Sequence, residues 1–215
     1  SRFVSERFHF AANIFAAVTS ILVALALDFT FSDIGLSLKH LWPGLLVAVI
    51  ASLVIFVGVI LISRIPFAGK YFKSSHSALR SSPSRLAYET AVRIPLSTAL
   101  TEEILFRGVL LGVLLTYHST IEAVVISSVV FGLWHISPAL NSTNRGYYLD
   151  IRQGAILSRI FHVAADVLAT SVAGLFFAWL RILSGSILAP WLVHWTINSS
   201  ALLSALFTAR GKKSK

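Results

Sequence analysis

The sequence predicts an all-α protein, a polytopic transmembrane helical bundle of about six spans. Of its 215 residues, 56% are hydrophobic and only 13% are charged. The mean hydropathy of +0.79 lies well above the range of soluble domains. The apolar residues gather into segments of roughly 20, the length that crosses a bilayer as a helix. Strands with open edges do not occur in hydrocarbon, so each segment is expected to be helical.

Six apolar segments follow one another along the chain. They cover approximately residues 8–27, 41–63, 94–117, 121–140, 155–180 and 184–208. The last four are interrupted by polar side chains. A connection between the second and third segments, about 64–93, is rich in Ser and basic residues, and we expect a cytoplasmic loop with an interfacial helix there.

The basic residues predict how the bundle is oriented. If the segments cross alternately, 15 of the 18 Lys and Arg residues fall on one side, and only Lys39 and Arg181 fall on the other. The positive-inside rule then places both termini in the cytoplasm and favours an even number of spans. A multi-pass protein of a prokaryotic plasma membrane is expected. The net charge of +9 is spread over helix ends and loops, which suits anionic headgroups and argues against a nucleic-acid partner.

The third segment carries three charges inside an otherwise lipid-soluble stretch, TALTEEILFRGVLLGVLL. A charged residue at the centre of a span costs about 2.5 to 3.5 kcal/mol on insertion scales, so Glu102, Glu103 and Arg107 need partners or a task. Glu103 and Arg107 are four residues apart and share a helix face, which predicts an intrahelical ion pair. Glu102 points about 100° away from Glu103 and needs a partner on another helix.

Later segments supply candidate partners for Glu102. FGLWHIS places His135 on the fourth segment, one turn after Phe131, and VHWTINSS places His194 and Asn198 four apart on the sixth. With alternate crossings, these side chains converge in the cytoplasmic half of the bilayer. A carboxylate beside an imidazole in a dry cavity suits a general base for a water molecule. A second His with an Asn supplies neutral donors for the oxyanion of a tetrahedral intermediate, so the set suggests amide hydrolysis.

The three motifs together resemble a known family. Glu102-Glu103-x-x-x-Arg107, Phe131-x-x-x-His135 and His194-x-x-x-Asn198, each on its own hydrophobic segment, are similar to those of the CAAX protease and bacteriocin-processing (CPBP, or Abi) family of intramembrane proteases. That family includes the Ras-converting CAAX endopeptidase of eukaryotes. The motifs lie within about 94–209, in the last four spans of what we expect to be a single membrane-embedded protease domain, 1–215.

The resemblance implies an activity and a role for each residue. Glu102 and His135 would activate the water, and His194 and Asn198 would form the oxyanion site. Glu103, Arg107 and Phe131 would be supporting residues. The implied enzyme is a glutamate-type intramembrane peptidase without a cofactor, whose partners are the lipid bilayer and a membrane-associated protein or peptide substrate.

Some alternatives stay open on the sequence alone. Glu102, His135 and His194 with a water would also make an acceptable catalytic zinc set, although H-E-x-x-H is absent. Ser186 is interpreted as a turn residue, and the pair His162 and Asp166 as helix-to-helix glue.

Two other classes of function would use the same polar residues. A non-catalytic membrane immunity or scaffold protein would use them as helix glue. A small transporter would use Glu102 and His135 as a proton relay, but paired half-helices of the transporter kind are not seen. Hydrolysis is the function that we favour.

Overall fold

The computed structural model describes residues 2–65, 82–144 and 156–210, and within these ranges it contains helices and no strand. The predicted all-α bundle is confirmed. α1 runs over Arg2–Ala26, and a 3₁₀ turn at Leu38–His40 (η1) leads into α2 at Leu41–Arg64. Beyond the third apolar segment come α8 (Thr120–Trp134), α9 (Ile136–Asn144), α10 (Ile156–Ser184) and α11 (Leu188–Arg210).

The third apolar segment forms one continuous helical rod that changes its hydrogen-bonding pattern along its length. In order, the rod consists of α5 (Pro83–Tyr88), the π-helix η2 (Glu89–Ala99), α6 (Leu100–Glu103), the π-helix η3 (Ile104–Leu110) and α7 (Leu111–Tyr117). Two stretches of π-helix of this length are unusual, and π-turns are often found at functional sites.

The rod begins earlier than the sequence predicted. We expected the third apolar segment from about residue 94, preceded by a cytoplasmic loop with an interfacial helix, but the rod starts at Pro83 and continues without a break. The reason is local: Ser82 caps the helix by accepting a hydrogen bond from the Arg85 amide at 3.2 Å, and proline is well suited to the first helical position. Residues 66–81 of the expected loop lie outside the described part of the chain.

The fourth predicted segment is divided at His135. This residue ends α8 with φ −84° and ψ 0°, and α9 begins at the next residue. Pro138 lacks the amide hydrogen that would bond the Trp134 carbonyl four residues earlier, so the α-helical pattern cannot run through this point. His135 therefore lies at a helix junction, where its backbone differs from that of a mid-helix residue.

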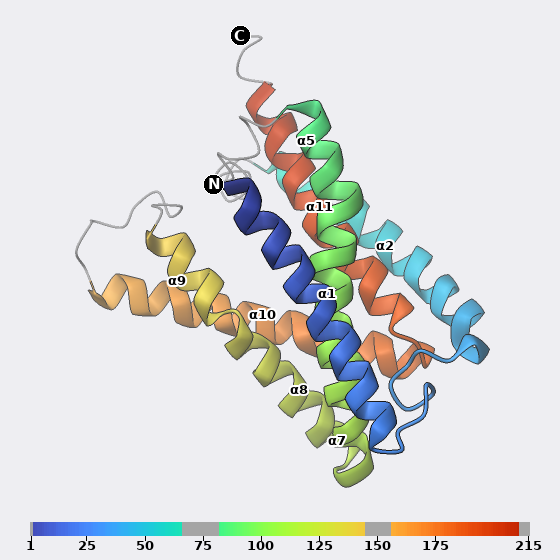
Figure 1. The fold of residues 1–215 in the computed structure, drawn as a ribbon. Helices are drawn as coiled ribbons and strands as arrows, with labels where there is room; N and C mark the ends of the chain where they lie inside the picture. The colour runs from blue at the N-terminus through green and yellow to red at the C-terminus, as the bar shows by residue number, and fades with distance from the viewer. Residues whose placement is uncertain (1, 66–81, 145–155, 211–215) are drawn as a thin grey trace.

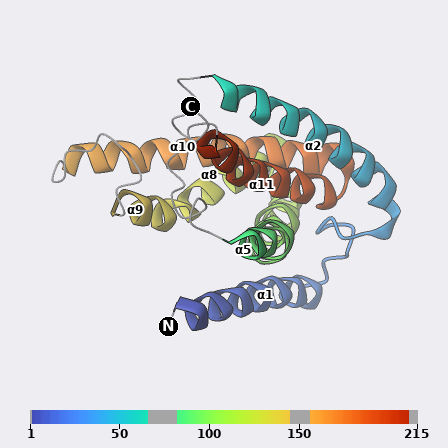
Figure 2. The same ribbon diagram turned by 90° about the horizontal axis from the view of Figure 1, so that it is seen from above.

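The helices beside the rod pack as two neighbouring pairs. α2 lies along α11, α8 lies against α10, and α1 lies along η2 and η3 (Figure 1). Seen from above, α1 and α2 are on opposite sides of the rod and α11 (Figure 2). Aromatic and aliphatic side chains from the rod, α8, α10 and α11 meet between them in the main core, which includes Phe106, Phe131, Phe177 and Val193.

Glycines allow α8 and α10 to approach closely. A Cβ atom on Gly132 would lie 1.9 Å from Ser171 Oγ and 2.7 Å from the Val167 carbonyl oxygen. A Cβ atom on Gly174 would lie 3.0 Å from the Cα of Ser128. Small residues at helix crossings are typical of membrane bundles, where packing rather than water drives association.

The chain is an integral membrane protein by the character of its helices. Four described helical stretches are long and apolar enough to cross a bilayer: Arg7–Ala26, Leu38–Ile62, Thr120–Asn141 and Ile156–Ser184. Their large apolar side chains are widely exposed, for example Leu53 on α2 at 62%, as expected of surfaces that face lipid. The rod, the end of α8 and α11 carry the polar side chains of the candidate site.

The loop between α1 and α2 packs against α10. Arg181 on α10 donates hydrogen bonds to the carbonyl oxygens of Ser32 at 3.3 Å and Asp33 at 3.0 Å. Gly35 has a positive φ of 70°, and a Cβ there would lie 2.2 Å from Arg181 Nε, so this position requires glycine. The carbonyl oxygens of the loop thus accept hydrogen bonds from the buried Arg181 guanidinium.

Candidate active site

Glu103 is held in the centre of the bundle by an ion pair on its own helix. Its Oε1 atom lies 3.1 Å from Nη1 of Arg107, and both side chains are fully buried. The predicted ion pair is therefore confirmed. A buried pair of this kind keeps either charge from facing hydrocarbon alone.

Aromatic rings complete the surroundings of Arg107. Its guanidinium carbon lies 3.9 Å above the centre of the Phe131 ring and 5.0 Å from that of Phe177, which are cation–π distances. The Nη2 atom donates to the Gly174 carbonyl oxygen at 3.4 Å. Phe131, which was expected to pack, is buried beneath this cation and contacts the His135 ring edge-on at 4.6 Å between centroids.

His194 is fixed by a carboxylate and by an aromatic ring. Its Nδ1 atom lies 2.8 Å from Oε1 of Glu103, the same oxygen that faces Arg107. The imidazole also stacks on Phe177, with centroids 4.9 Å apart and planes inclined by 18°. Phe177 was not predicted as a site residue, because a phenylalanine on an apolar helix has no distinguishing sequence signal.

Glu102 faces both histidines. Its Oε2 atom lies 3.9 Å from Nε2 of His135 and 3.8 Å from Nε2 of His194. The expected convergence of the three side chains is thus observed, although both distances exceed a direct hydrogen bond. The same Oε2 atom is buried and has no hydrogen-bond partner among the residues that the structure describes.

The hydrogen bonds of the two rings decide which nitrogen faces Glu102. Nδ1 of His135 lies 2.8 Å from the Phe131 carbonyl oxygen, which only accepts, so Nδ1 carries the hydrogen. Nδ1 of His194 donates in the same way to the Glu103 carboxylate. In a neutral ring each Nε2 is then an acceptor directed at Glu102.

This assignment changes one expectation. We expected His194 to be a neutral donor to an oxyanion, but its Nε2 atom can donate only when the ring also carries a second proton. The Glu103 carboxylate contacts the other ring nitrogen, Nδ1.

The remaining predicted residues lie at different distances from this centre. Asn198 is half-buried one turn after His194 on α11, and its side chain makes no hydrogen bond to another described residue. Ser186 lies in the turn between α10 and α11, where its hydroxyl accepts from the Leu188 amide at 3.2 Å, in agreement with a turn role. His162 bonds through Nδ1 to the Ser158 carbonyl oxygen at 2.6 Å on α10.

Two tryptophans join α11 to the rod beside the site. Nε1 of Trp191 donates to the Pro95 carbonyl oxygen at 2.8 Å, and Nε1 of Trp195 donates to that of Thr90 at 2.6 Å. The proline inside η2 was a sequence signal that could have pointed to Trp195, because a proline lacks the amide that would bond the Thr90 carbonyl oxygen.

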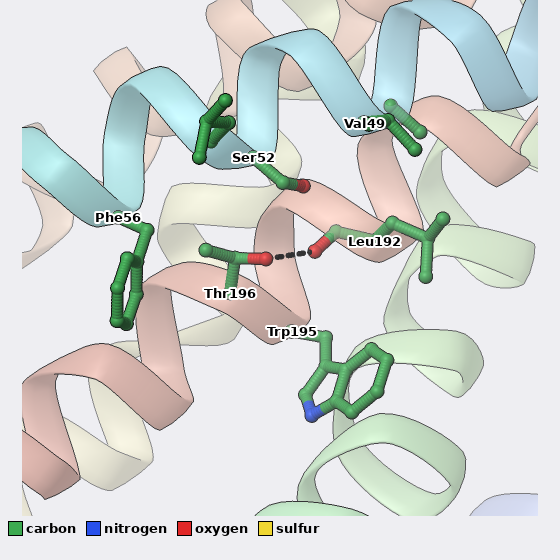
Figure 3. A pocket seen from close by; sticks show the side chains of 8 residues that line it. Val49, Ser52, Phe56, Leu192, Trp195 and Thr196 are labelled. Carbon is green, nitrogen blue, oxygen red and sulfur yellow. Dashed lines mark hydrogen bonds between the residues drawn. The ribbon is translucent and has the colours of Figure 1, made fainter.

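Trp195 also borders an open apolar groove between α2 and α11. This pocket has a volume of about 360 Å³ and, as Figure 3 shows, Ser52, Phe56 and Thr196 lie around it together with the indole. The full lining is Ala48, Val49, Ser52, Leu53, Phe56, Leu192, Trp195 and Thr196. Neither the carboxylates nor the histidines of the site line it, so the chemistry is assigned to the buried cluster.

A zinc ion, if the enzyme uses one, would be held by Glu102, His135 and His194, which face one another. In the part of the chain that the structure describes, no group of three or more His, Asp or Glu side chains is already arranged around a metal position. The steps proposed below involve the protein side chains and water.

Comparison with known proteins agrees with the geometry. The model of the family described as type II CAAX prenyl endopeptidase Rce1-like matches residues 85–200, a stretch that begins in α5, ends in α11 and includes every residue of the three motifs. No curated protein and no solved structure matches the chain. The match covers more than half of the 215 residues, and the chain belongs to the type II CAAX prenyl endopeptidase Rce1-like family.

Proposed function

We propose that the protein is an intramembrane endopeptidase that hydrolyses a peptide bond of a membrane-associated protein or peptide near the cytoplasmic face. Family membership supports a CAAX-protease type of enzyme. The observation that carries the proposal is one carboxylate oxygen, the buried Oε2 of Glu102, which faces two imidazole nitrogens at 3.8 and 3.9 Å. This arrangement has the parts of a water-activating centre and lies among membrane helices.

The spacing suits a water molecule shared by Glu102 and His135. Groups 3.9 Å apart are too distant for a direct bond, but each can bond the same water. Glu102 takes one proton of this water as its oxygen attacks the carbonyl carbon of the scissile bond. The Nε2 atom of His135 accepts the other hydrogen and orients the attacking lone pair.

The tetrahedral intermediate places a negative charge on the former carbonyl oxygen. Asn198 donates to it from its side-chain amide, and His194 donates from Nε2 as an imidazolium held by Glu103. Glu102 then passes its proton to the leaving nitrogen, and the carbon–nitrogen bond breaks. The products are a new carboxyl terminus and a free amine.

The family description indicates which peptides to examine first. We propose that the substrate is lipid-anchored and carries a C-terminal CAAX-type sequence. Peptides with and without a prenyl group are to be compared. The outcome of the test also decides between catalysis and a non-catalytic immunity or scaffold role, because a binding protein yields no cleavage product.

The test uses purified protein in nanodiscs and quenched fluorogenic CAAX peptides with and without a prenyl group. Wild type, Glu102→Gln and His135→Ala are compared, each with and without a chelator. We expect turnover by wild type alone and no effect of chelation, with both variants melting near the wild-type temperature. Turnover by folded Glu102→Gln would remove that residue from the mechanism. Loss of wild-type turnover on chelation, restored by zinc, would show a metalloprotease.

A further inference from the structure

Pro95 leaves a gap in the hydrogen bonding of η2. It lies inside this π-helix, in which each amide normally bonds the carbonyl oxygen five residues earlier. For residue 95 that oxygen belongs to Thr90, but proline has no amide hydrogen to give. A carbonyl oxygen that is partly withdrawn from water without a donor is destabilising, so the Thr90 oxygen needs a donor from elsewhere.

Trp195 supplies that donor from another helix. Its indole Nε1 lies 2.6 Å from the Thr90 carbonyl oxygen, the acceptor that an amide at position 95 would otherwise occupy. Trp191, one turn earlier on α11, bonds the Pro95 carbonyl oxygen at 2.8 Å, and the two indoles stack with centroids 6.5 Å apart. α11 is thereby joined to η2 at two points.

These bonds fix the register between the two halves of the candidate site. Trp195 directly follows His194 on α11, and η2 leads straight into α6, which carries Glu102 and Glu103. A slide of α11 by one residue would move both indoles off their carbonyl oxygens and His194 off Glu103. Since the contact of Glu102 with His194 is 3.8 Å, small shifts change it substantially.

We propose that Trp195 is a positioning residue: its indole N–H replaces the amide that Pro95 lacks and holds α11 in the register that faces His194 to Glu102. This inference rests on the proposed function for its kinetic consequence. The hydrogen-bond replacement itself stands independently of any activity.

Trp191 provides an internal comparison. The oxygen that it bonds, on Pro95, also receives the amide of Leu100, so this acceptor keeps one partner when the indole is removed. The Thr90 oxygen has no such amide from residue 95. Replacing Trp195 is therefore expected to lower kcat more than replacing Trp191.

The kinetic experiment compares Trp195→Phe, Trp191→Phe and Trp179→Phe with the double variant Pro95→Ala/Trp195→Phe. Trp179 is exposed on α10 and stacks on Phe176, so its replacement is the matched control. We expect kcat of Trp195→Phe to fall roughly 10- to 100-fold with little change in KM, because catalysis depends steeply on alignment. The double variant regains most of the loss, since an alanine at position 95 brings an amide for the Thr90 oxygen.

A second measurement does not depend on turnover. The protein has five tryptophans, so ¹⁵N-indole spectra in detergent contain few signals, which the Phe variants assign. We expect slow deuterium exchange at the Trp195 indole in wild type and faster exchange in Pro95→Ala, where the new amide competes for the same oxygen.

The outcomes separate this inference from the proposed function. If wild type cleaves no peptide, the proposed function fails, and the exchange data still test the hydrogen-bond replacement. If Trp195→Phe keeps full kcat, or if the folded double variant is as impaired as Trp195→Phe, the positioning role is wrong. Equal exchange at the Trp195 indole in wild type and Pro95→Ala would contradict the replacement itself.

Discussion

Oε1 of Glu103 lies 2.8 Å from Nδ1 of His194, and through this contact the rod holds the orientation of an imidazole on α11. The same oxygen lies 3.1 Å from Arg107. A buried carboxylate that contacts a histidine in this way fixes the tautomer and the orientation of the ring. Glu103 therefore links the ion pair of the rod to the chemistry proposed at Glu102.

Replacing Glu103 separates a structural role from a positioning role. In Glu103→Gln the buried charge of Arg107 loses its partner, which we expect to lower the free energy of unfolding by roughly 3 to 5 kcal/mol. Thermal unfolding in a fixed detergent measures the loss.

The matched variant is Glu103→Gln/Arg107→Met, in which both charges are removed together. We expect most of the stability to return, since a buried pair can often be replaced by apolar groups. We expect kcat to stay low because Nδ1 of His194 no longer faces a carboxylate. Full activity in this variant would show that Glu103 acts on stability alone.

Asn198 is predicted to act on the oxyanion only. Asn198→Ala should reduce kcat by about 10²- to 10³-fold, the usual effect of removing one oxyanion donor, and leave KM nearly unchanged. Steady-state kinetics with the fluorogenic peptides provide the measurement. Ser199→Ala is the neighbouring control, because the Ser199 hydroxyl is buried and has no partner among the described residues. Equal kcat values for the two variants would argue against the role.

Gly132 is predicted to be essential for the packing of α8 on α10. An alanine Cβ there would lie 2.7 Å from the Val167 carbonyl oxygen, and we expect overpacking to destabilise the protein by about 1 to 3 kcal/mol. Gly58→Ala on α2 is the control, since nothing lies within 4 Å of its added Cβ. That change should stabilise the helix by roughly 0.5 to 1 kcal/mol. Equal melting temperatures for the two variants would contradict the prediction.

The orientation of the bundle is predicted from charge and can be read by cysteine labelling. The chain has no cysteine, so single substitutions give an unambiguous signal. Ser32→Cys in the α1–α2 loop should react with an impermeant maleimide from outside intact cells, whereas Ser84→Cys should react only after permeabilisation. The opposite pattern would invert the orientation and move the site away from the cytoplasmic face.

The sequence by itself determined the class of fold and most members of the candidate site. Hydropathy and segment length are local properties of the sequence, so they were enough to predict an all-α membrane bundle. The spacing of Glu103 and Arg107 was enough to predict their ion pair, which the structure confirms. Charged residues in an apolar helix need polar partners. This requirement identified Glu102, His135 and His194 as candidate site residues from the sequence.

Only the tertiary structure decided how those residues meet. The pairing of Glu103 with His194, the choice of Nε2 as the nitrogen facing Glu102, and the break at His135 all depend on contacts and backbone geometry that spacing does not contain. The π-helical rod is a further case. The sequence alone shows that residue 95 is a proline and lacks an amide hydrogen. The donor that replaces this amide is the indole of Trp195, which is 100 residues later in the chain. Such long-range hydrogen bonds depend on how helices pack, and helix packing is a property of the whole bundle.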